Sequence, residues 1–379
     1  MPIIKQKICF VLTAEFAVKA FLLNHLRVLS QFYDITVIVN TDNPNFLAEI
    51  GVNAKVIPLK IARDISLFLD LICLLKLVKI FYQQGFSAVH SITPKAGLLA
   101  MLAAWINRLP LRVHTFTGQV WATKSGYKRF FLKQVDCLIA SLTTHNMVDS
   151  PSQCKFLVGE KVITPEKSIV FGQGSISGVD LLRFKPNQQT KKNIRQQLNI
   201  DTDAIIFLFV GRLTKDKGVL DLAWAFSMLT GANSHLLLVG PDEQNVQKEI
   251  MQITTACSAY VHFVGHTNQP ESYMAAADVL CLPSYREGFG SVVIEAAAAG
   301  IPTIASRIYG LTDALVDSET GLLHEPGNIE DIKNKMRLLI ESKPFRLNLG
   351  LEARIRTIKY FDCQAITQDW LKFYQENVH

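Results

Sequence analysis

The stretch that decides the fold is Glu287-Gly-Phe-Gly-Ser-Val-Val-Ile-Glu295, which follows an apolar run that ends at Leu282. An apolar run, a glycine-containing loop and a helix of small apolar residues are typical of a strand-to-helix junction in a parallel α/β sheet. Glycine lets the backbone approach a ligand closely, and the first N–H groups of the helix point towards the strand end. A phosphate group suits that position. We therefore predict a ligand-binding loop here.

The same alternation of short apolar runs and longer helical patterns extends along the whole chain. Strands are predicted at 8–13, 35–40, 54–59, 88–92, 111–116 and 168–171, and again at 205–210, 235–239, 260–264, 279–282, 302–305 and 321–323. Helices are predicted at 18–32, 67–83, 97–106, 128–138 and 219–229. Such alternation is typical of parallel βαβ units with helices on both faces of the sheet. The pattern occurs twice, so we predict two doubly wound domains.

The length of 379 residues exceeds the size at which single cores usually stop growing. We expect an N-terminal domain at 1–180, a C-terminal domain at 181–355 and a helix at 356–379 that packs back towards the first domain. The polar stretch 185–199 is the predicted linker or surface segment near the boundary. Ligands of open α/β sheets bind at the carboxyl ends of the strands, so two such domains that face each other form a cleft lined by loops.

Charge is distributed unevenly between the two halves. Residues 1–180 contain 19 Lys and Arg against 11 Asp and Glu, a net charge of +8, whereas residues 181–379 contain 20 against 22, a net charge of −2. A basic first half indicates an anionic partner, for which a membrane surface, a diphosphate lipid and a nucleic acid are all candidates. A solvated surface without a partner is an equally good interpretation.

The longest uncharged apolar run, Ala96 to Asn107, has about half the roughly 20 residues that cross a bilayer, so a buried helix is expected. The apolar N-terminal run is interrupted by Glu15 and is interpreted as a strand and not a signal peptide. The seven cysteines are scattered, with no Cys/His spacing typical of metal ligands. We therefore expect reduced thiols, a cytoplasmic location and no metal cofactor.

Glu287 precedes the predicted helix and Glu295 lies about one turn inside it, so both carboxylates can face one pocket. Carboxylates accept hydrogen bonds from hydroxyl pairs such as those of a sugar and a ribose. The alternative is that Glu295 complements the helix dipole and Glu287 is a solvated loop charge. The flanking Gly-Phe-Gly and the small-residue helix that ends at Gly300 favour the functional interpretation.

A second loop, Val210-Gly-Arg-Leu-Thr-Lys-Asp-Lys-Gly218, joins a predicted strand to a predicted helix. Arg212 can fork two phosphate oxygens and Lys217 can act as a point charge, so together they can neutralise a diphosphate. Taken alone, either residue is better explained as a basic side chain on a surface loop. The spacing of a Walker loop is absent.

Two further features in the first half are open to more than one interpretation. The glycines at 172, 174 and 178 do not have the spacing of a dinucleotide fingerprint, so a tight turn at the exit of the first domain is predicted. His114 lies at a strand end, where a lone histidine is more often structural than catalytic.

Basic and aromatic side chains interleave between 121 and 133. This pattern indicates docking at an anionic bilayer, helped by the apolar helix 67–83 with its two lysines, although packing of the aromatics into the core explains it equally well. Binding of single-stranded nucleic acid is a weaker option because no recognisable module accompanies the pattern. The residues concerned are Trp121, Lys124, Tyr127, Lys128, Arg129, Phe130, Phe131 and Lys133.

The second half of the sequence resembles family 4 of the retaining glycosyltransferases along nearly its whole length. The matching segments are Gly211-Arg-Leu-x4-Lys-Gly218, Leu237-Leu-Val-Gly240, Val264-Gly-His266, Ala277-Asp-Val-x-Cys-Leu-Pro-Ser284, Glu287-Gly-Phe-Gly-x4-Glu295 and Asp317-x-x-Thr-Gly-Leu-Leu323. The first half resembles a narrower bacterial branch that extends polyprenyl-diphosphate-linked sugars for O-antigen, capsule or N-glycan assembly. The segments that carry this likeness are His90-Ser-Ile-Thr-Pro-Lys-Ala-Gly97, His114-Thr-Phe-Thr-Gly-Gln-Val-Trp-Ala-Thr123, Asp149-Ser-Pro-Ser-Gln153 and Gly172-Gln-Gly-Ser-x-x-Gly-Val-Asp180.

The resemblance implies a GT-B fold, a UDP-linked N-acetylhexosamine donor, a polyprenyl-diphosphate-linked saccharide acceptor, no metal and no nucleic acid. It also implies an enzyme on the inner face of the cytoplasmic membrane. Arg212 and Lys217 would bind the diphosphate, and His114 would lie near the reacting centre. Glu287, with the Phe289 and Gly290 backbone, would orient the donor sugar for the reaction, and Glu295 would bind the ribose. The other residues implied in donor binding are Gly288, Ser291 and His266. Many members have a glycine-rich loop after the first strand, but Thr13-Ala-Glu-Phe-Ala-Val18 contains no glycine.

The expected reaction is transfer with retention, in which the two cations stabilise the departing nucleoside diphosphate. No residue is identified as a carboxylate nucleophile, so front-side attack by the acceptor hydroxyl is favoured. Two alternatives stay open at this point. One is a nucleotide-sugar 2-epimerase of the same fold, and the other is a non-catalytic nucleotide-sugar or lipid binding protein, against which the presence of both glutamates counts.

Overall fold

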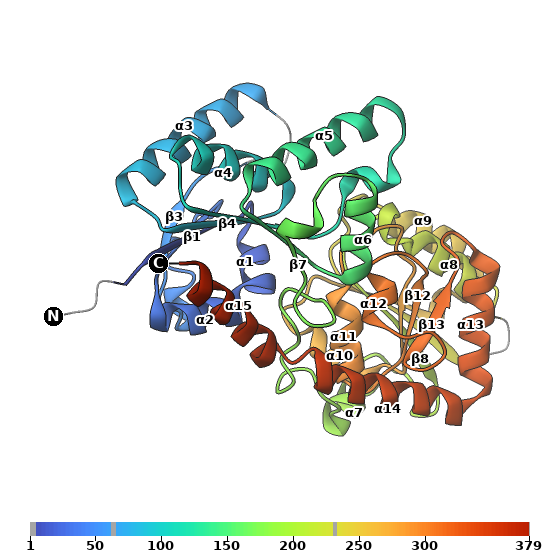
Figure 1. The fold of residues 1–379 in the computed structure, drawn as a ribbon. Helices are drawn as coiled ribbons and strands as arrows, with labels where there is room; N and C mark the ends of the chain where they lie inside the picture. The colour runs from blue at the N-terminus through green and yellow to red at the C-terminus, as the bar shows by residue number, and fades with distance from the viewer. Residues whose placement is uncertain (1–4, 62–65, 230–232, 379) are drawn as a thin grey trace. The chain divides into compact units, whose positions relative to one another are not determined.

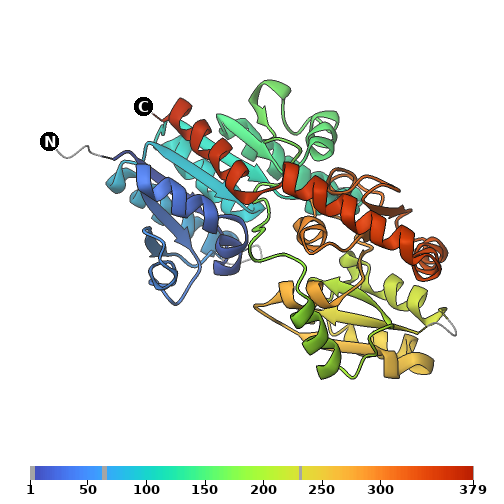
Figure 2. The same ribbon diagram turned by 90° about the horizontal axis from the view of Figure 1, so that it is seen from below.

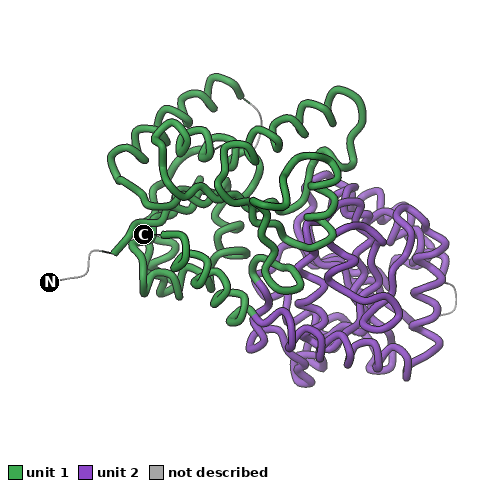
Figure 3. Tube along the Cα trace, in the orientation of Figure 1, with its two compact units in different colours: residues 1–177, 363–379 green, residues 178–362 purple. Residues whose placement is uncertain are grey.

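The computed structural model describes residues 5–61, 66–229 and 233–378, and the chain divides into two compact units. Unit 1 comprises residues up to 177 and from 363 onwards, and unit 2 comprises residues 178–362 (Figure 3). Each unit contains one parallel sheet with helices on both faces, which confirms the predicted class of two doubly wound α/β domains. The last helix returns to unit 1 and begins at Cys363 and not at 356, because residues 343–360 form one continuous helix of unit 2.

The sheet of unit 1 has seven described strands in the order β3-β2-β1-β4-β5-β6-β7. The strand order reverses between β1 and β4, which is the switch point of a doubly wound sheet. The strands are β1 (Lys7–Val11), β2 (Asp34–Val39), β3 (Lys55–Pro58), β4 (Ala88–Ile92), β5 (Leu111–Phe116), β6 (His145–Val148) and β7 (Ser168–Ile169).

Helices cover both faces of this sheet because side chains along each strand alternate in direction. Figure 1 shows α1, α2 and α15 on one face of the sheet and α3, α4 and α5 on the other. On β1, Phe10 belongs to the core on the first face, whereas Cys9 and Val11 belong to the core on the second. Figure 2 shows α15 beside α2, and Trp370 of α15 stacks on His25 of α2 at a ring distance of 4.3 Å. The helices are α1 (Glu15–Phe21), α2 (Leu23–Phe32), α3 (Leu67–Gln84), α4 (Pro94–Ile106), α5 (Gly126–Leu142), α6 (Pro151–Gly159) and α15 (Cys363–Asn377).

The sheet of unit 2 has six described strands in the order β10-β9-β8-β11-β12-β13 around a single apolar core. Its strands are β8 (Ile205–Val210), β9 (Ser234–Val239), β10 (Val261–Gly265), β11 (Val279–Leu282), β12 (Thr303–Ser306) and β13 (Gly321–His324). Its helices are α7 (Gln188–Gln197), α8 (Val219–Ser227), α9 (Gln247–Ile253), α10 (Pro270–Ala276), α11 (Ser291–Ala298), α12 (Leu311–Ala314), α13 (Ile329–Glu341) and α14 (Lys343–Tyr360).

Three sequence-based expectations differ from the structure. Strand β6 was not predicted because its short sequence His-Asn-Met-Val shows no clear apolar run. The helix expected at 18–32 is broken into α1 and α2 at Leu22. The polar stretch 185–199 is a surface segment, as one of its two interpretations predicted, but it contains the helix α7 and is not a linker. The buried residue of α7 is Arg195 and not an apolar side chain. Arg195 forms an ion pair with Asp278 at 2.5 Å. Because the buried residue of this helix is charged, its sequence shows no apolar periodicity from which a helix could be predicted.

The glycine-rich segment after β7 forms turns, as predicted, with positive φ at all three of its glycines, 172, 174 and 178. In the part of the chain that the structure describes, no helix is long and apolar enough to cross a membrane.

Candidate active site

Two loops of unit 2 bring most of the predicted site residues together. The first follows β8 and ends at Gly218, and the second follows β11 and ends at Gly290. Both strands are parallel and adjacent, so their loops lie at the same carboxyl edge of the sheet.

A close backbone approach holds the two loops together. Gly218 has φ +67°, and a Cβ atom at this position would lie 1.9 Å from the carbonyl oxygen of Pro283. Only glycine fits here, for both conformational and steric reasons. The backbone N–H of Tyr285 donates to the carbonyl of Asp216 at 2.9 Å, and Arg286 forms an ion pair with the Asp216 carboxylate at 3.2 Å. The loops therefore form one polar surface.

Lys217 and Glu287 meet on this surface. Lys217 Nζ donates to Glu287 Oε1 at 2.6 Å, and the side chains are only 18% and 13% exposed. Ser284 Oγ donates to the same carboxylate oxygen at 2.8 Å. A partly buried, charge-assisted hydrogen bond of this kind fixes both side chains. Two of the predicted site residues, one from each loop, are thus in direct contact.

Arg212 lies on the same loop as Lys217 but in a different environment. Its guanidinium donates to Glu243 at 2.8 Å, and the Arg212 side chain is 40% exposed. An exposed ion pair stabilises little and exchanges partners easily. Arg212 can therefore be released to an anion at small cost, whereas Lys217 is already held in place.

The loop before α11 offers backbone groups. Gly290 is in the left-handed conformation with φ +81°, and a Cβ there would lie 2.5 Å from Leu311 Cδ2. The Phe289 ring is fully buried and packs on Phe361 at a ring distance of 5.3 Å, so Phe289 and Gly290 can contact a ligand through their backbones alone. A Cβ at Gly310 would lie 2.4 Å from the carbonyl oxygen of Gly288. The loop before α11 therefore packs directly against the backbone of the loop that contains Gly310.

Glu295 contrasts with Glu287. It lies in the second turn of α11, is half-buried, and forms no side-chain hydrogen bond or ion pair with the residues that the structure describes. Burial raises the pKa of the Glu295 carboxyl to about 7, and the charges of Arg183 and Glu271 act in opposite directions. A carboxylate with unused acceptor capacity suits a pair of hydroxyl groups.

The remaining predicted donor-side residues are Ser291 and His266. Ser291 is the first residue of α11, and His266 is exposed immediately after β10. Neither side chain hydrogen-bonds another site residue within the described ranges. Within those ranges, no group of three or more His, Cys, Asp or Glu side chains is arranged to hold a metal ion.

His114 belongs to unit 1, where it lies near the carboxyl end of β5 and is only 2% exposed. Its Nδ1 is 2.8 Å from Ser91 Oγ, and its ring packs on the first turn of α4, where a Cβ at Gly97 would lie 2.4 Å from His114 Cε1. Burial lowers the pKa of His114 to about 3. This histidine is therefore neutral at physiological pH.

Residues that the sequence did not single out also shape the site. Ser284, Arg286 and Glu243 each contact a predicted residue or its loop. Ser284 and Arg286 lie in the loop between the predicted strand that ends at Leu282 and the predicted helix that follows. Their place in this loop could have indicated that they belong to the site. Glu243 comes from the loop after β9. Its pairing with Arg212 depends on β8 and β9 being neighbours in the sheet, which the local sequence around either residue does not reveal.

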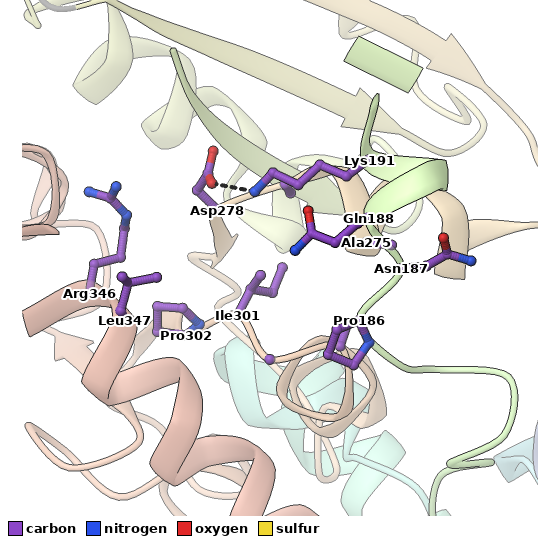
Figure 4. Close-up of a pocket in the computed structure, with 13 residues that line it drawn as sticks. Pro186, Asn187, Gln188, Lys191, Ala275, Asp278, Ile301, Pro302, Arg346 and Leu347 are labelled. Atoms are coloured by element: carbon purple, nitrogen blue, oxygen red, sulfur yellow. Dashed lines mark hydrogen bonds and ion pairs between the residues drawn. The ribbon is translucent and has the colours of Figure 1, made fainter. Parts of the chain in front are cut away.

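A separate small hollow in unit 2 lies away from these loops. Its lining includes Asp278 and Pro302, which directly precede β11 and β12, so it lies at the amino edge of the sheet (Figure 4). Lys191 and Asp278 form an ion pair across it at 2.9 Å. This hollow is not part of the candidate site.

Two parallel doubly wound units, with a helix N-terminus and paired charges at one carboxyl edge of unit 2, are the architecture expected of the GT-B fold. Residues 190–356 match the family model described as glycosyl transferases group 1. The chain is 32% identical over 325 residues to the capsular polysaccharide biosynthesis glycosyltransferase CapM of Staphylococcus aureus, with 85% of this chain and 84% of CapM covered. The chain belongs to this glycosyltransferase family, as the motifs predicted, and is a hexosyltransferase.

Other similar proteins carry related descriptions. The chain is 28% identical over 321 residues to the UDP-Gal:alpha-D-GlcNAc-diphosphoundecaprenol alpha-1,3-galactosyltransferase of Escherichia coli, with 82% of this chain and 81% of the relative covered. Among solved structures, HepE of Anabaena in complex with UDP and glucose superimposes with a TM-score of 0.81 at 20% identity, covering 98% of this chain and 100% of HepE. Sucrose-phosphate synthase of Thermosynechococcus elongatus gives a TM-score of 0.82 at 23% identity, covering 98% and 99%. These two structures support the fold alone.

Proposed function

We propose that the protein transfers a sugar, an N-acetylhexosamine, from a UDP-sugar donor to a polyprenyl-diphosphate-linked saccharide in the assembly of a bacterial surface polysaccharide or glycan. The observation that carries the proposal is the contact between Lys217 and Glu287 beside the N-terminus of α11. The names of two similar proteins support the acceptor class. One is the Escherichia coli galactosyltransferase above, and another is an N,N'-diacetylbacillosaminyl-diphospho-undecaprenol alpha-1,3-N-acetylgalactosaminyltransferase of Campylobacter jejuni, which is 26% identical over 310 residues.

In this proposal, cations of unit 2 bind the donor diphosphate. Lys217 is held rigidly by Glu287, and Arg212 leaves its exposed pair with Glu243 to fork the phosphate oxygens. The first N–H groups of α11, from Ser291 onwards, add the positive end of a helix dipole. Charge that develops on the leaving diphosphate is thereby stabilised by groups that are already oriented.

Hydroxyl groups of the donor are assigned to the two glutamates. The ionised form of Glu295 accepts hydrogen bonds from the ribose hydroxyls, for which its lack of a described partner leaves it available. Glu287, with the backbones of Gly288, Phe289 and Gly290, orients the transferred sugar. His266, exposed after β10, is assigned to the nucleotide side of the donor.

The proposed reaction retains the anomeric configuration and needs no metal ion. The acceptor hydroxyl oxygen bonds to the anomeric carbon on the face that the diphosphate leaves. The bond from that carbon to the phosphate oxygen breaks, and the hydroxyl proton passes to the departing phosphate. Lys217 and Arg212 supply the countercharge to the leaving diphosphate. The neutral His114 of unit 1 is assigned, by the family resemblance, a position near the reacting centre. The enzyme is proposed to act in the cytoplasm, peripherally bound to the inner face of the cytoplasmic membrane through its basic first half.

The test is a panel of radiolabelled UDP-sugars incubated with the protein, with and without a polyprenyl-diphosphate-linked saccharide. The proposal predicts a labelled lipid product only when both substrates are present, with the largest yield from a UDP-N-acetylhexosamine. A free sugar altered at C2 without acceptor would identify a 2-epimerase instead. Nucleotide-sugar binding without turnover under any condition would identify a non-catalytic protein.

A further inference from the structure

Helix α3 of unit 1 exposes apolar side chains on the face that points away from the sheet. Cys73, Leu77 and Phe81 are its buried residues, and they form the stripe that packs on the domain core. The opposite face of a surface helix is normally polar. Here the first half of that face is apolar instead, and Phe68 is 73% exposed. The exposed apolar residues of this half are Leu67, Phe68, Leu69, Leu71, Ile72 and Leu75.

Helix α5 presents a second apolar group at its own first turns. Tyr127 is 94% exposed, and Phe130 and Phe131 are 63% and 59% exposed. Trp121, in contrast, is buried, and its Nε1 donates to Asp136 at 2.7 Å. The aromatic residues between 121 and 133 therefore divide: the tryptophan is in the core, and the other three are on the surface.

These two groups lie on the same side of unit 1. Helices α3, α4 and α5 cover one face of the seven-stranded sheet, with α4 between the other two (Figure 1). Each of the three helices follows a strand of a parallel sheet, so each begins at the carboxyl edge. Lys95 in the first turn of α4 reaches Asp70 in the first turn of α3 at 2.7 Å, which ties these helix starts together. The exposed apolar residues thus gather at the carboxyl edge of the sheet.

The charges on this side are mostly positive. The three helices carry six Lys and Arg residues and two acids. Both acids are engaged, Asp70 by Lys95 and Asp136 by the buried tryptophan. Of the six cations, Lys95 pairs with Asp70, and Arg129 and Lys133 pair with Glu160 at the C-terminal end of α6. Lys76 and Lys79 are exposed on α3, and Lys128 is exposed at the start of α5. Apolar side chains flanked by lysines match the acyl boundary and the headgroups of an anionic bilayer.

We propose that the first turns of α3 and α5 insert into the surface of an anionic lipid bilayer, with the surrounding lysines on its headgroups. The apolar residues of α3 supply the main binding, and the basic residues select for anionic lipid. Because His114 lies near the same carboxyl edge, the acceptor site of unit 1 then lies close to the headgroup layer. This placement favours acceptors whose reacting sugar is near the lipid diphosphate. That last step rests on the proposed sugar transfer, whereas the insertion specifies the surface for the membrane binding that the proposed function includes.

The binding experiment uses the full chain and sedimented vesicles of phosphatidylglycerol and phosphatidylethanolamine, with phosphatidylcholine vesicles as the neutral reference. The double variant Leu71→Ser/Leu75→Ser should bind anionic vesicles at least tenfold more weakly than the wild type. The matched control is Leu347→Ser/Leu351→Ser, which removes two equally exposed leucines from α14 of unit 2 and should bind like the wild type. Lys76→Gln/Lys79→Gln should lose the preference for anionic over neutral vesicles.

Equal vesicle binding by the α3 double variant and the wild type would overturn the proposal, as would equal losses in the α3 and α14 variants. A wild-type protein that ignores vesicles but dissociates from a dimer to a monomer on Leu71→Ser/Leu75→Ser would assign the surface to a second copy of the chain. Unchanged UDP binding in each variant shows that unit 2 is folded, and circular dichroism checks unit 1.

A kinetic arm separates this proposal from the proposed function. With a long-chain polyprenyl acceptor in vesicles, the α3 double variant should show a KM raised about tenfold with little change in kcat. With a short-chain, water-soluble acceptor, its KM should equal that of the wild type. If the wild type transferred sugar to neither acceptor, the proposed function would be refuted, while the vesicle result would still decide the insertion.

Discussion

The carboxyl edges of the two sheets have opposite physical characters. In unit 2 the edge is ionic, because Lys217, Glu287 and Arg212 form ion pairs at loop ends. In unit 1 the edge holds a buried, neutral His114 beside helices whose first turns expose apolar side chains. The same type of sheet therefore carries two different surfaces: one suits a charged, water-soluble donor, and the other suits an acceptor that is presented by a lipid.

The largest effect should come from Lys217. Lys217→Met keeps an unbranched side chain one atom shorter and removes its charge, so the leaving diphosphate loses a fixed counterion. We expect kcat to fall by about 10²- to 10³-fold, the range for removing one preorganised electrostatic group. Steady-state kinetics with a UDP-sugar measure this loss. Lys215→Met, which removes an exposed lysine of the same loop that pairs with Glu249, should leave kcat within about twofold, and an equal loss there would contradict the role of Lys217.

The next effect concerns how the two loops are held together. Gly218→Ala places a Cβ against the Pro283 carbonyl and also strains a positive φ, so the loops must separate. We expect activity to fall at least tenfold and the free energy of unfolding to fall by about 3 kcal/mol. Gly265→Ala is the control, because its φ is +77° but nothing lies within 4 Å of the added Cβ. It should cost only about 1 to 2 kcal/mol. Equal costs in denaturant titrations would show that the loop contact does not matter.

A smaller effect is expected from the ionisation of Glu295. Since burial raises its pKa to about 7, the carboxylate is the minor form at pH 6 and the major form at pH 8. Affinity for UDP-N-acetylglucosamine, whose diphosphate does not titrate in this range, should therefore rise about tenfold from pH 6 to pH 8. Glu295→Gln should bind with a flat pH profile and as weakly as the protonated wild type. A wild-type profile in this variant, measured by calorimetry, would remove Glu295 from the donor site.

The smallest effect is on the acid stability of unit 1. Burial lowers the pKa of His114 to about 3, so the unfolded chain, with a pKa near 6.5, takes up this proton first as the pH falls. Stability from neutral His114 is thus present above pH 6.5 and lost below it, by about 1 kcal/mol between pH 7 and pH 5.5. His114→Gln should reduce that pH dependence of the free energy of unfolding by this amount, while the buried His25 and His90, whose pKa values burial also lowers, keep their own contributions. His266→Gln, at an exposed position of unit 2, should not change it, and identical profiles for all three proteins would show that His114 does not contribute.

Much of unit 2 could be predicted from its sequence because its site is built from local motifs. Glu287 and Gly290 belong to one strand-loop-helix segment, and Lys217 and Gly218 belong to another, so spacing alone indicates a loop at a strand end. The contact between Lys217 and Glu287 could not be predicted, since it depends on β8 pairing with β11 and on the glycine that lets the two loops touch.

Unit 1 was less predictable because its decisive features depend on burial. The aromatic residues near α5 had two equally good interpretations from sequence, and the structure divides these residues between core and surface: Trp121 is buried, whereas Tyr127 is exposed. Arg129 and Lys133, which were grouped with the membrane-facing cations, both pair with Glu160 instead. An ion pair between residues about 30 positions apart leaves no local pattern in the sequence.

The most direct test of the division between the two units is the affinity for UDP, measured by isothermal titration calorimetry at pH 8. The account predicts that Lys217→Met weakens UDP binding at least tenfold, because the lysine of unit 2 binds the diphosphate. It also predicts that His114→Gln, in unit 1, leaves the Kd within about twofold of the wild type. Wild-type affinity in Lys217→Met, or an equal loss in both variants, would contradict the claim that the loops of unit 2 bind the donor.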